Sequence, residues 1–255
     1  MQKKISFKNG KGLTLRGVIH LPKNYDSAII YCHGFPGSAK GSSTKRFAKT
    51  FEKLGFLVLR FNFSHTPNSD GKFQDKLMSK EVSDIKYAIS FLKKNYKFKK
   101  LILIGHSTGA IDASLYACKD KRINKLILSG AVSNLKHAAR YDFTDEQMRD
   151  FWRKGYIIYK KPKEWVNRKK IKKAFYDEFF TLNIPKAMKK FRRPLLIIHG
   201  EKDEAIPSDK DPLEIYKLAN KPKKLVILKN ADHSYKKKGT WKPFVSQVYK
   251  FIKAK

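Results

Sequence analysis

The sequence is poor in cysteine. Its 255 residues include only Cys32 and Cys118, and both lie in apolar blocks that we interpret as a buried strand and a buried helix. Two isolated thiols exclude a disulfide framework and are too few for a structural zinc site. We therefore expect reduced core thiols, no metal centre and a cytoplasmic location.

Long hydrophobic runs are also missing. Runs such as LLII at 195–198 are far shorter than the roughly 18 apolar residues that a membrane-spanning helix requires. The first residues, MQKKISFKNGKGLTL, lack the apolar stretch of about 7–15 residues found in secretory signal peptides. The sequence therefore predicts neither a transmembrane segment nor a secretion signal.

Acidic residues are few, and the formal net charge is +35. The chain has 57 Lys plus Arg against 22 Asp plus Glu, and 47 of the basic residues are Lys, spread from Lys3 to Lys255. Proteins that read nucleic-acid phosphates tend to concentrate Arg and to cluster their charge. We therefore favour a lysine-rich solvated surface without a specific nucleic-acid partner, and a polyanion-binding surface is the alternative.

Hydrophobic residues make up 41% of the chain and come in two alternating patterns, which indicates a globular α/β protein. Short β-branched runs predict strands at 13–21, 27–32, 56–61, 100–104, 125–129, 194–198 and 224–228. Helical spacing of apolar residues predicts helices at 43–54, 81–94 and 241–252. Asn9-Gly10-Lys11-Gly12 predicts a hairpin between strands near 3–8 and 12–21. We expect a mostly parallel sheet with helices on both faces and an antiparallel start.

Residues 134–190 interrupt the alternation. They contain no convincing strand, read as several amphipathic helices and hold eleven aromatic residues. The segment is too long for a connection, so we interpret it as a helical cap inserted into a core formed by 1–133 and 191–255. Its aromatic residues would pack on the core or line an apolar pocket.

The motif Gly105-His106-Ser107-Thr108-Gly109 follows a predicted strand and precedes a predicted helix. A serine between glycines at such a turn is typical of a nucleophile elbow, in which a strained backbone lifts the hydroxyl above the sheet. The following helix would point its N-terminal amides at a developing oxyanion.

A serine nucleophile needs a base and an orienting carboxylate. Asp203 follows the strand at 194–198, and His233 follows the strand at 224–228. The chain order Ser107, Asp203, His233 is that of α/β-hydrolases. Other carboxylates (Glu201, Glu204, Asp232) and other histidines (His20, His33, His65, His106, His137, His199) compete for these roles. Among the competing histidines, His20 and His199 lie in or beside strands, where a core role is more common.

The segment His33-Gly34-Phe35-Pro36-Gly37 follows another predicted strand. This is the place of an oxyanion-hole loop. Because proline has no N–H, the amide of Phe35 is the expected donor, together with the amide of Thr108.

Taken together, these motifs resemble the α/β-hydrolase superfamily, and most of all its small esterases grouped with cinnamoyl (feruloyl) esterases and monoacylglycerol lipases. The resemblance implies an eight-stranded, mostly parallel sheet with the cap inserted after strand six. It implies Ser107 as nucleophile, His233 as base and then acid, and Asp203 as the orienting carboxylate. The residues expected to contact substrate are Phe35, His106, Trp152 and Tyr156.

The sequence departs from these relatives at several positions. The Gly-rich segment usual after the fourth strand reads FNFSHTPNSDG at 61–71, and Thr108 and Ala110 replace residues that are more usual there. These changes leave Ser107, Asp203 and His233 intact, and they bear on which class of substrate the protein would accept. We expect a serine carboxylesterase that acts on small to medium acyl esters, aromatic acyl esters included, without a cofactor, as a monomer or homodimer. The alternatives are a thioesterase, a serine aminopeptidase-like acyl hydrolase, and a decayed hydrolase that binds a polyanion.

Overall fold

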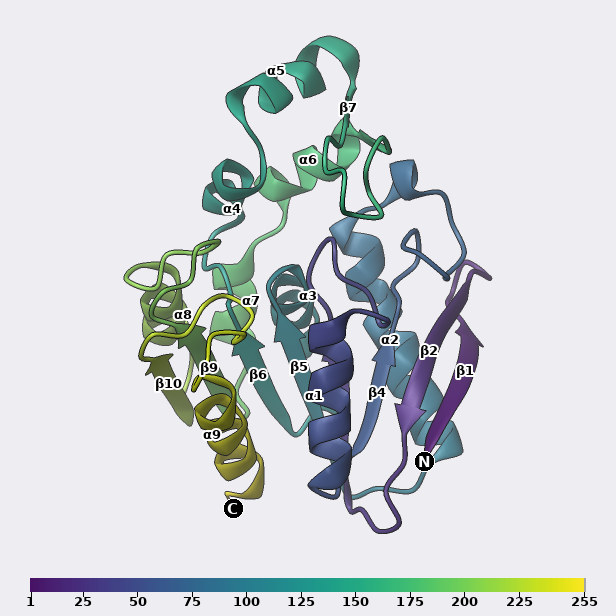
Figure 1. The fold of residues 1–255 in the computed structure, drawn as a ribbon, viewed down its shortest axis with the longest axis vertical. Helices are drawn as coiled ribbons and strands as arrows, with labels where there is room; N and C mark the ends of the chain where they lie inside the picture. Colours follow the sequence, from purple (N-terminus) through teal and green to yellow (C-terminus); the bar gives the residue numbers. More distant parts are fainter. Residues whose placement is uncertain (255) are drawn as a thin grey trace.

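The computed structural model describes residues 1–254 and is built on an eight-stranded sheet in the order β1-β2-β4-β3-β5-β6-β9-β10 (Figure 1). Its strands are β1 (Gln2–Lys8), β2 (Thr14–His20), β3 (Ser27–Cys32), β4 (Leu57–Phe61), β5 (Lys100–His106), β6 (Lys125–Ser129), β9 (Leu195–Gly200) and β10 (Lys223–Leu228). β1 and β2 form the expected antiparallel hairpin, and β2 also pairs antiparallel with β4. The remaining neighbours in this sheet, in the order β4-β3-β5-β6-β9-β10, all pair in parallel, which confirms the predicted fold class.

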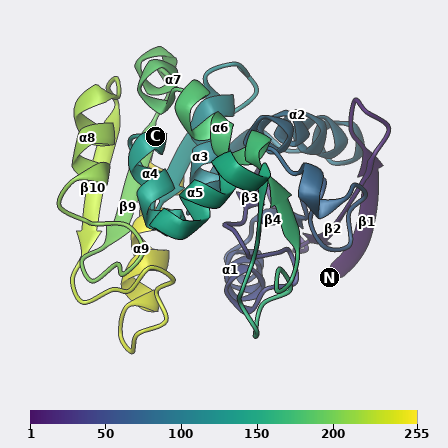
Figure 2. The same cartoon turned by 90° about the horizontal axis from the view of Figure 1, so that it is seen from above.

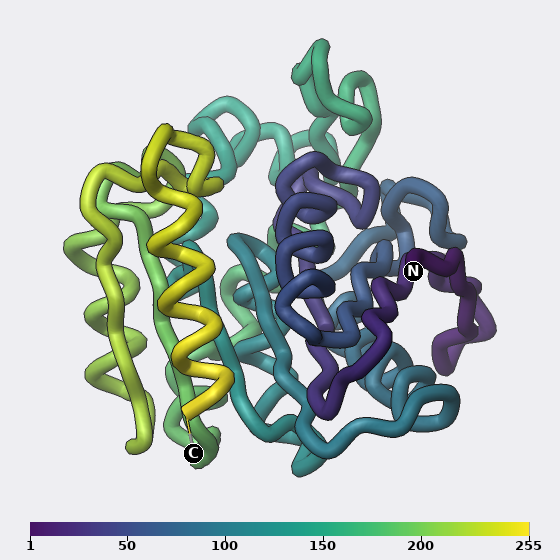
Figure 3. The backbone as a smooth tube through the Cα atoms, turned by 60° about the horizontal axis from the view of Figure 1, so that its bottom comes forward, coloured from purple at the N-terminus to yellow at the C-terminus, as the bar shows by residue number. Residues whose placement is uncertain are grey.

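Helices cover both faces of this sheet. The core helices are α1 (Ser42–Lys53), α2 (Met78–Asn95), α3 (Thr108–Ala117), α7 (Ile184–Lys190), α8 (Asp211–Leu218) and α9 (Trp241–Lys253), and a short 3-10 helix, η1 (Phe73–Asp75), precedes α2. α1 and α9 lie on the same face (Figure 3). The other core helices pack on the opposite face. Successive residues of β5 alternate between the two cores, as a strand buried on both faces requires.

The segment between β6 and β9 lies above the carboxyl ends of the strands (Figures 1 and 2). It contains α4 (Leu135–Asp142), α5 (Asp145–Lys154), β7 (Tyr156–Ile158), β8 (Lys170–Lys172), α6 (Lys173–Thr181) and then α7. The sequence predicts no strand here, yet β7 and β8 pair antiparallel. Each has only three residues, too few for an alternating pattern to be visible in the sequence.

The last helix of this segment belongs with the core layers, since α7 packs against α3 and α8. We use "the cap" below for residues 134–182 and "the cap arm" for residues 159–169, which join β7 to β8. The arm descends toward the loop that follows β3. None of the helices within residues 1–254 is long and apolar enough to span a bilayer.

Candidate active site

Ser107 occupies a strained turn between β5 and α3. Its backbone has φ 56° and ψ −126°, a conformation that costs energy for a residue with a side chain. A Cβ at Gly105 would lie 2.2 Å from the Gly109 carbonyl oxygen, and a Cβ at Gly109 would lie 2.3 Å from that of Cys32. The two glycines of the motif are therefore required by close backbone approach, as the elbow interpretation predicts.

Two backbone amides near Ser107 have no acceptor. Neither the Phe35 amide nor the Thr108 amide donates a hydrogen bond to any atom of residues 1–254. Gly34 lets the loop that carries Phe35 approach Ser107 closely, because a Cβ at Gly34 would lie 2.7 Å from Ser107 Cβ. Amides left free beside a serine hydroxyl are the donors that an oxyanion requires.

His233 and Asp203 come together from the loops after β10 and β9. His233 Nδ1 lies 2.8 Å from Asp203 Oδ2. The other oxygen, Oδ1, accepts hydrogen bonds from the amides of Ala205 and Ile206, both at 2.9 Å. Because Nδ1 donates to the carboxylate, Nε2 of His233 is left as the proton acceptor.

The carboxylate of Asp203 is strongly held in its ionised form. Burial alone would raise its pKa, but hydrogen bonds from His199 and His233 outweigh burial and hold the pKa well below the usual range. His199 is fully buried, and its Nε2 lies 3.1 Å from Asp203 Oδ2 and 3.0 Å from the Ile206 carbonyl oxygen. A nitrogen beside a carbonyl oxygen must carry the proton, so the single N–H of His199 is shared between the Ile206 carbonyl oxygen and the oxygen of Asp203 that accepts from His233.

Gly130, directly after β6, leaves the room that the His233 ring needs. Its φ is +55°, and a Cβ there would lie 2.9 Å from His233 Cε1. His106 also contacts this ring, with 4.8 Å between ring centroids and 39° between the ring planes. Burial, followed by the charge of His233, lowers the pKa of His106 to about 3, so its side chain is neutral.

A cavity of about 310 Å³ opens over these residues, and Ser107 and His233 both line it. No hydrogen bond within residues 1–254 joins Ser107 Oγ to His233, and such bonds often tighten only when substrate is bound. Of the residues expected to contact substrate, Phe35 and His106 line this cavity. Trp152 and Tyr156 do not line it, and Trp152 is 71% exposed on the cap.

The cap arm is bound to the loop after β3. The indole N–H of Trp165 donates to the Pro36 carbonyl oxygen. The rings of Phe35, Phe73, Tyr159 and Trp165 form an aromatic cluster, with centroids 5.0–6.2 Å apart. The aromatic content of the cap is visible in the sequence, but this contact is not, because Trp165 and Pro36 lie more than 100 residues apart in the chain.

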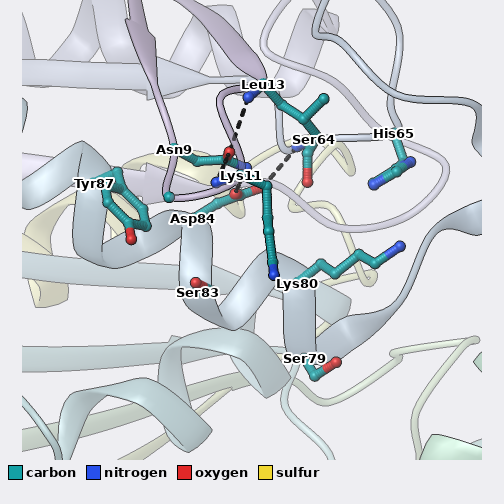
Figure 4. A pocket seen from close by; sticks show the side chains of 11 residues that line it. Asn9, Lys11, Leu13, Ser64, His65, Ser79, Lys80, Ser83, Asp84 and Tyr87 are labelled. Carbon is teal, nitrogen blue, oxygen red and sulfur yellow. Dashed lines mark hydrogen bonds between the residues drawn. The ribbon is translucent and has the colours of Figure 1, made fainter.

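A larger cavity, of about 580 Å³, is lined by residues of the β1–β2 turn and of α2 (Figure 4), and Ser107, Asp203 and His233 are not among its lining residues. It lies between the β1–β2 turn and α2. The buried Asp84 carboxylate at its floor is already satisfied, since Asn9 Nδ2 and the Ser64 amide each donate to it at 2.7 Å. We read this contact as structural, because it fastens the hairpin turn to α2, and we place the chemistry in the smaller cavity that holds Ser107.

Across the described part of the chain, no group of three or more His, Cys, Asp and Glu side chains is arranged to hold a metal ion.

The chain is similar to several known proteins. A family model described as serine aminopeptidase, S33, matches residues 23–236. The mitochondrial palmitoyl-protein thioesterase ABHD10 of Bos taurus is 20% identical over 222 residues, which cover 85% of this chain and 70% of that protein.

Solved structures share the fold along nearly the whole chain. Est1E from Butyrivibrio proteoclasticus, solved with ferulic acid bound, has a TM-score of 0.82 at 24% identity and 97% coverage of both chains. The α/β hydrolase GrgF from Penicillium sp. sh18 has a TM-score of 0.82 at 20% identity, with coverage of 99% and 98%. The Pyrococcus furiosus esterase PF2001 has a TM-score of 0.78 at 22% identity, with coverage of 99% and 91%. These likenesses establish the fold that the motifs predicted.

Proposed function

Because the chain belongs to the serine aminopeptidase S33 family and has the α/β-hydrolase fold, it is a hydrolase, and we propose that it is a serine carboxylesterase for small to medium acyl esters. The observation that carries the proposal is the 2.8 Å contact between His233 and Asp203, with His233 lining the same cavity as Ser107.

In the proposed mechanism, Ser107 Oγ attacks the ester carbonyl carbon while His233 Nε2 takes the hydroxyl proton. Asp203 keeps the imidazole in the tautomer that leaves Nε2 free and stabilises the imidazolium. The amides of Phe35 and Thr108 donate to the oxyanion of the tetrahedral intermediate. His233 then protonates the leaving alcohol, and water, activated by the same imidazole, hydrolyses the acyl-enzyme on Ser107.

The size of the cavity supports small to medium acyl groups. Its volume of about 310 Å³ is at the lower end of the range for pockets that bind small organic molecules. Closure of the cap arm onto the loop of Phe35 and Pro36 limits its extension on that side.

A thioester is the second candidate substrate. The favouring observation is the similarity to a protein named as a palmitoyl-protein thioesterase. The same serine, histidine and free amides would serve a thioester, because its carbonyl passes through the same kind of tetrahedral oxyanion.

The test is hydrolysis of p-nitrophenyl esters from acetate to palmitate by the wild-type chain and by Ser107→Ala. We expect turnover with an optimum at short or medium chains and a loss of at least about 10³-fold in Ser107→Ala. Ser6→Ala, which changes an exposed serine on β1, is the matched control and should retain full activity. Turnover of acyl-coenzyme A thioesters but not of oxygen esters would favour the second candidate, and wild-type activity in Ser107→Ala would refute the site.

A further inference from the structure

One wall of the catalytic cavity is the N-terminal end of helix α1. Gly41 and the first three residues of α1, Ser42, Ser43 and Thr44, line the same cavity as Ser107 and His233. The helix therefore points its amino end at the space in which an ester would lie, and the end of a twelve-residue helix carries a partial positive charge.

This end of the helix has no cap of its own. No side chain accepts a hydrogen bond there, and the first turn contains no acidic residue. The first amide with an acceptor within residues 1–254 is that of Lys45, which donates to the Gly41 carbonyl oxygen at 2.9 Å, so the amides of Ser42, Ser43 and Thr44 remain unpaired. Unpaired helix N-terminal amides are suited to an anion.

A buried hydroxyl supports the same interpretation independently. Thr44 is only 5% exposed, yet it lines the cavity, and its hydroxyl forms no hydrogen bond with any described residue. Because the residue is buried everywhere except where it lines the cavity, only water or a group bound in the cavity can supply a partner to this hydroxyl. The hydroxyl of Thr44 is thus a donor available to a group bound in the cavity.

The charged side chains around the cavity favour an anion on this wall. Lys236 lines the cavity and has no ion pair within the described residues. Arg46, one turn into α1, donates to the carbonyl oxygens of Ser234 and Tyr235 at 3.2 and 2.9 Å, which holds the loop of Lys236 against the helix. Two carboxylates oppose an anion here. Glu164 is an exposed residue that lines the cavity from the cap arm, and Asp232 accepts from the Lys236 and Lys237 amides at 2.7 and 2.9 Å.

We propose that the N-terminal end of α1, with Thr44 and Lys236, binds a carboxylate or phosphate of the substrate, so that the preferred substrates are anionic esters. This inference rests on the proposed esterase function and specifies the substrate class of that site. The anion would sit across the cavity from the ester carbonyl, which Ser107 and the free amides hold.

The test compares two pairs of esters that differ in one negative charge. On the acyl side the pair is mono-4-nitrophenyl succinate and p-nitrophenyl butyrate, and on the alcohol side it is 4-acetoxybenzoate and phenyl acetate. We expect Lys236→Gln and Thr44→Val each to lower kcat/KM for the anionic member of at least one pair by about 3–10-fold more than for its neutral member. Glu164→Gln should instead raise the ratio of kcat/KM for the anionic ester to kcat/KM for the neutral ester of the same pair.

Lys238→Gln is the matched control, because it removes the same charge from the same loop at an exposed position that does not line the cavity. It should leave the ratio unchanged. Equal losses in Lys236→Gln and Lys238→Gln, or equal losses for charged and neutral esters, would overturn the subsite, and melting temperatures exclude unfolding as the cause.

Failure of the proposed function is distinguishable from failure of the subsite. If the wild-type chain hydrolyses none of these esters, the esterase proposal fails and the subsite is tested by calorimetric titration with succinate. Saturable binding that weakens in Lys236→Gln but not in Lys238→Gln would support an anion site, and no saturable binding would refute it.

Discussion

The carboxylate of Asp203 binds two imidazoles at one oxygen. His233 donates to Oδ2 at 2.8 Å. The N–H of His199, shared with the Ile206 carbonyl oxygen, lies 3.1 Å from the same oxygen, and two backbone amides donate to Oδ1. Four donors fix the position of the carboxylate and keep it ionised. We therefore expect His199 to act as a positioning residue, whose effect reaches the substrate only through Asp203 and His233.

We expect His199→Leu to lower kcat by about 10–100-fold with little change in KM, because a hydrogen bond to a charged group contributes roughly 1.5–3 kcal/mol. The measurements are steady-state kinetics with p-nitrophenyl butyrate and the low-field proton NMR signal of the His233 N–H that faces Asp203. His199→Gln, whose amide N–H can reach the same oxygen, should recover most of the activity. An unchanged kcat and an unchanged NMR signal in a folded His199→Leu would show that His199 only fills the core.

The sequence placed Ser107, Asp203 and His233 in the order and at the strand ends where the structure has them. Strand ends were predictable because β-branched runs stop abruptly at the loops that carry these residues. His199 was interpreted as a core histidine, since one residue inside a strand gives no information about what its ring contacts. A histidine four residues before the expected acid is the signal that could have identified it.

Among the elements, the cap arm contacts the loop that carries a proposed oxyanion donor. Trp165 binds the carbonyl of Pro36, next to the residue whose amide is the proposed oxyanion donor. The aromatic cluster of Phe35, Phe73, Tyr159 and Trp165 supports this contact by packing. The position of the Phe35 amide thus depends on the cap as well as on the core.

Trp165→Phe should lower kcat/KM by about 3–10-fold, because it keeps an aromatic ring and removes one hydrogen bond worth roughly 0.5–1.5 kcal/mol. Trp165→Ala should lower it further, since the cluster loses a ring. Kinetics with p-nitrophenyl butyrate measure both effects. Trp152→Phe is the control on the exposed side of the cap, and a loss there equal to that of Trp165→Phe would contradict the role of the arm.

The elements themselves differed in how well the sequence predicted them. The predicted core strands match β2–β6, β9 and β10 within about three residues, because alternating or fully buried apolar runs are long enough to recognise. β7 and β8 were missed, because three-residue strands carry no periodic signal. The packing of α7 on α3 and α8 was also missed. An amphipathic pattern shows that one face of a helix is buried, but it does not show which element covers that face.

At the scale of the whole molecule, the formal charge of +35 creates a field that attracts anions. Salt screens such a field over about 10 Å at 0.1 M ionic strength. We expect kcat/KM for mono-4-nitrophenyl succinate to fall by about 3–10-fold between 0.05 and 0.5 M NaCl, and kcat/KM for p-nitrophenyl butyrate to stay nearly constant. Stopped-flow or plate-based initial rates over a salt series measure both, and identical salt dependence of the two esters would argue against electrostatic steering.

The contact between Trp165 and Pro36 has a consequence for anyone who would redesign this pocket. The cap arm and the loop of Phe35 and Pro36 are joined, although they are separated by over a hundred residues of sequence. Truncating the arm to admit bulkier molecules would remove the support of the amide that we propose as an oxyanion donor, so we expect it to lower the catalytic rate while it widens access. A broader pocket must therefore be opened from the opposite wall, or the arm and the loop must be redesigned together.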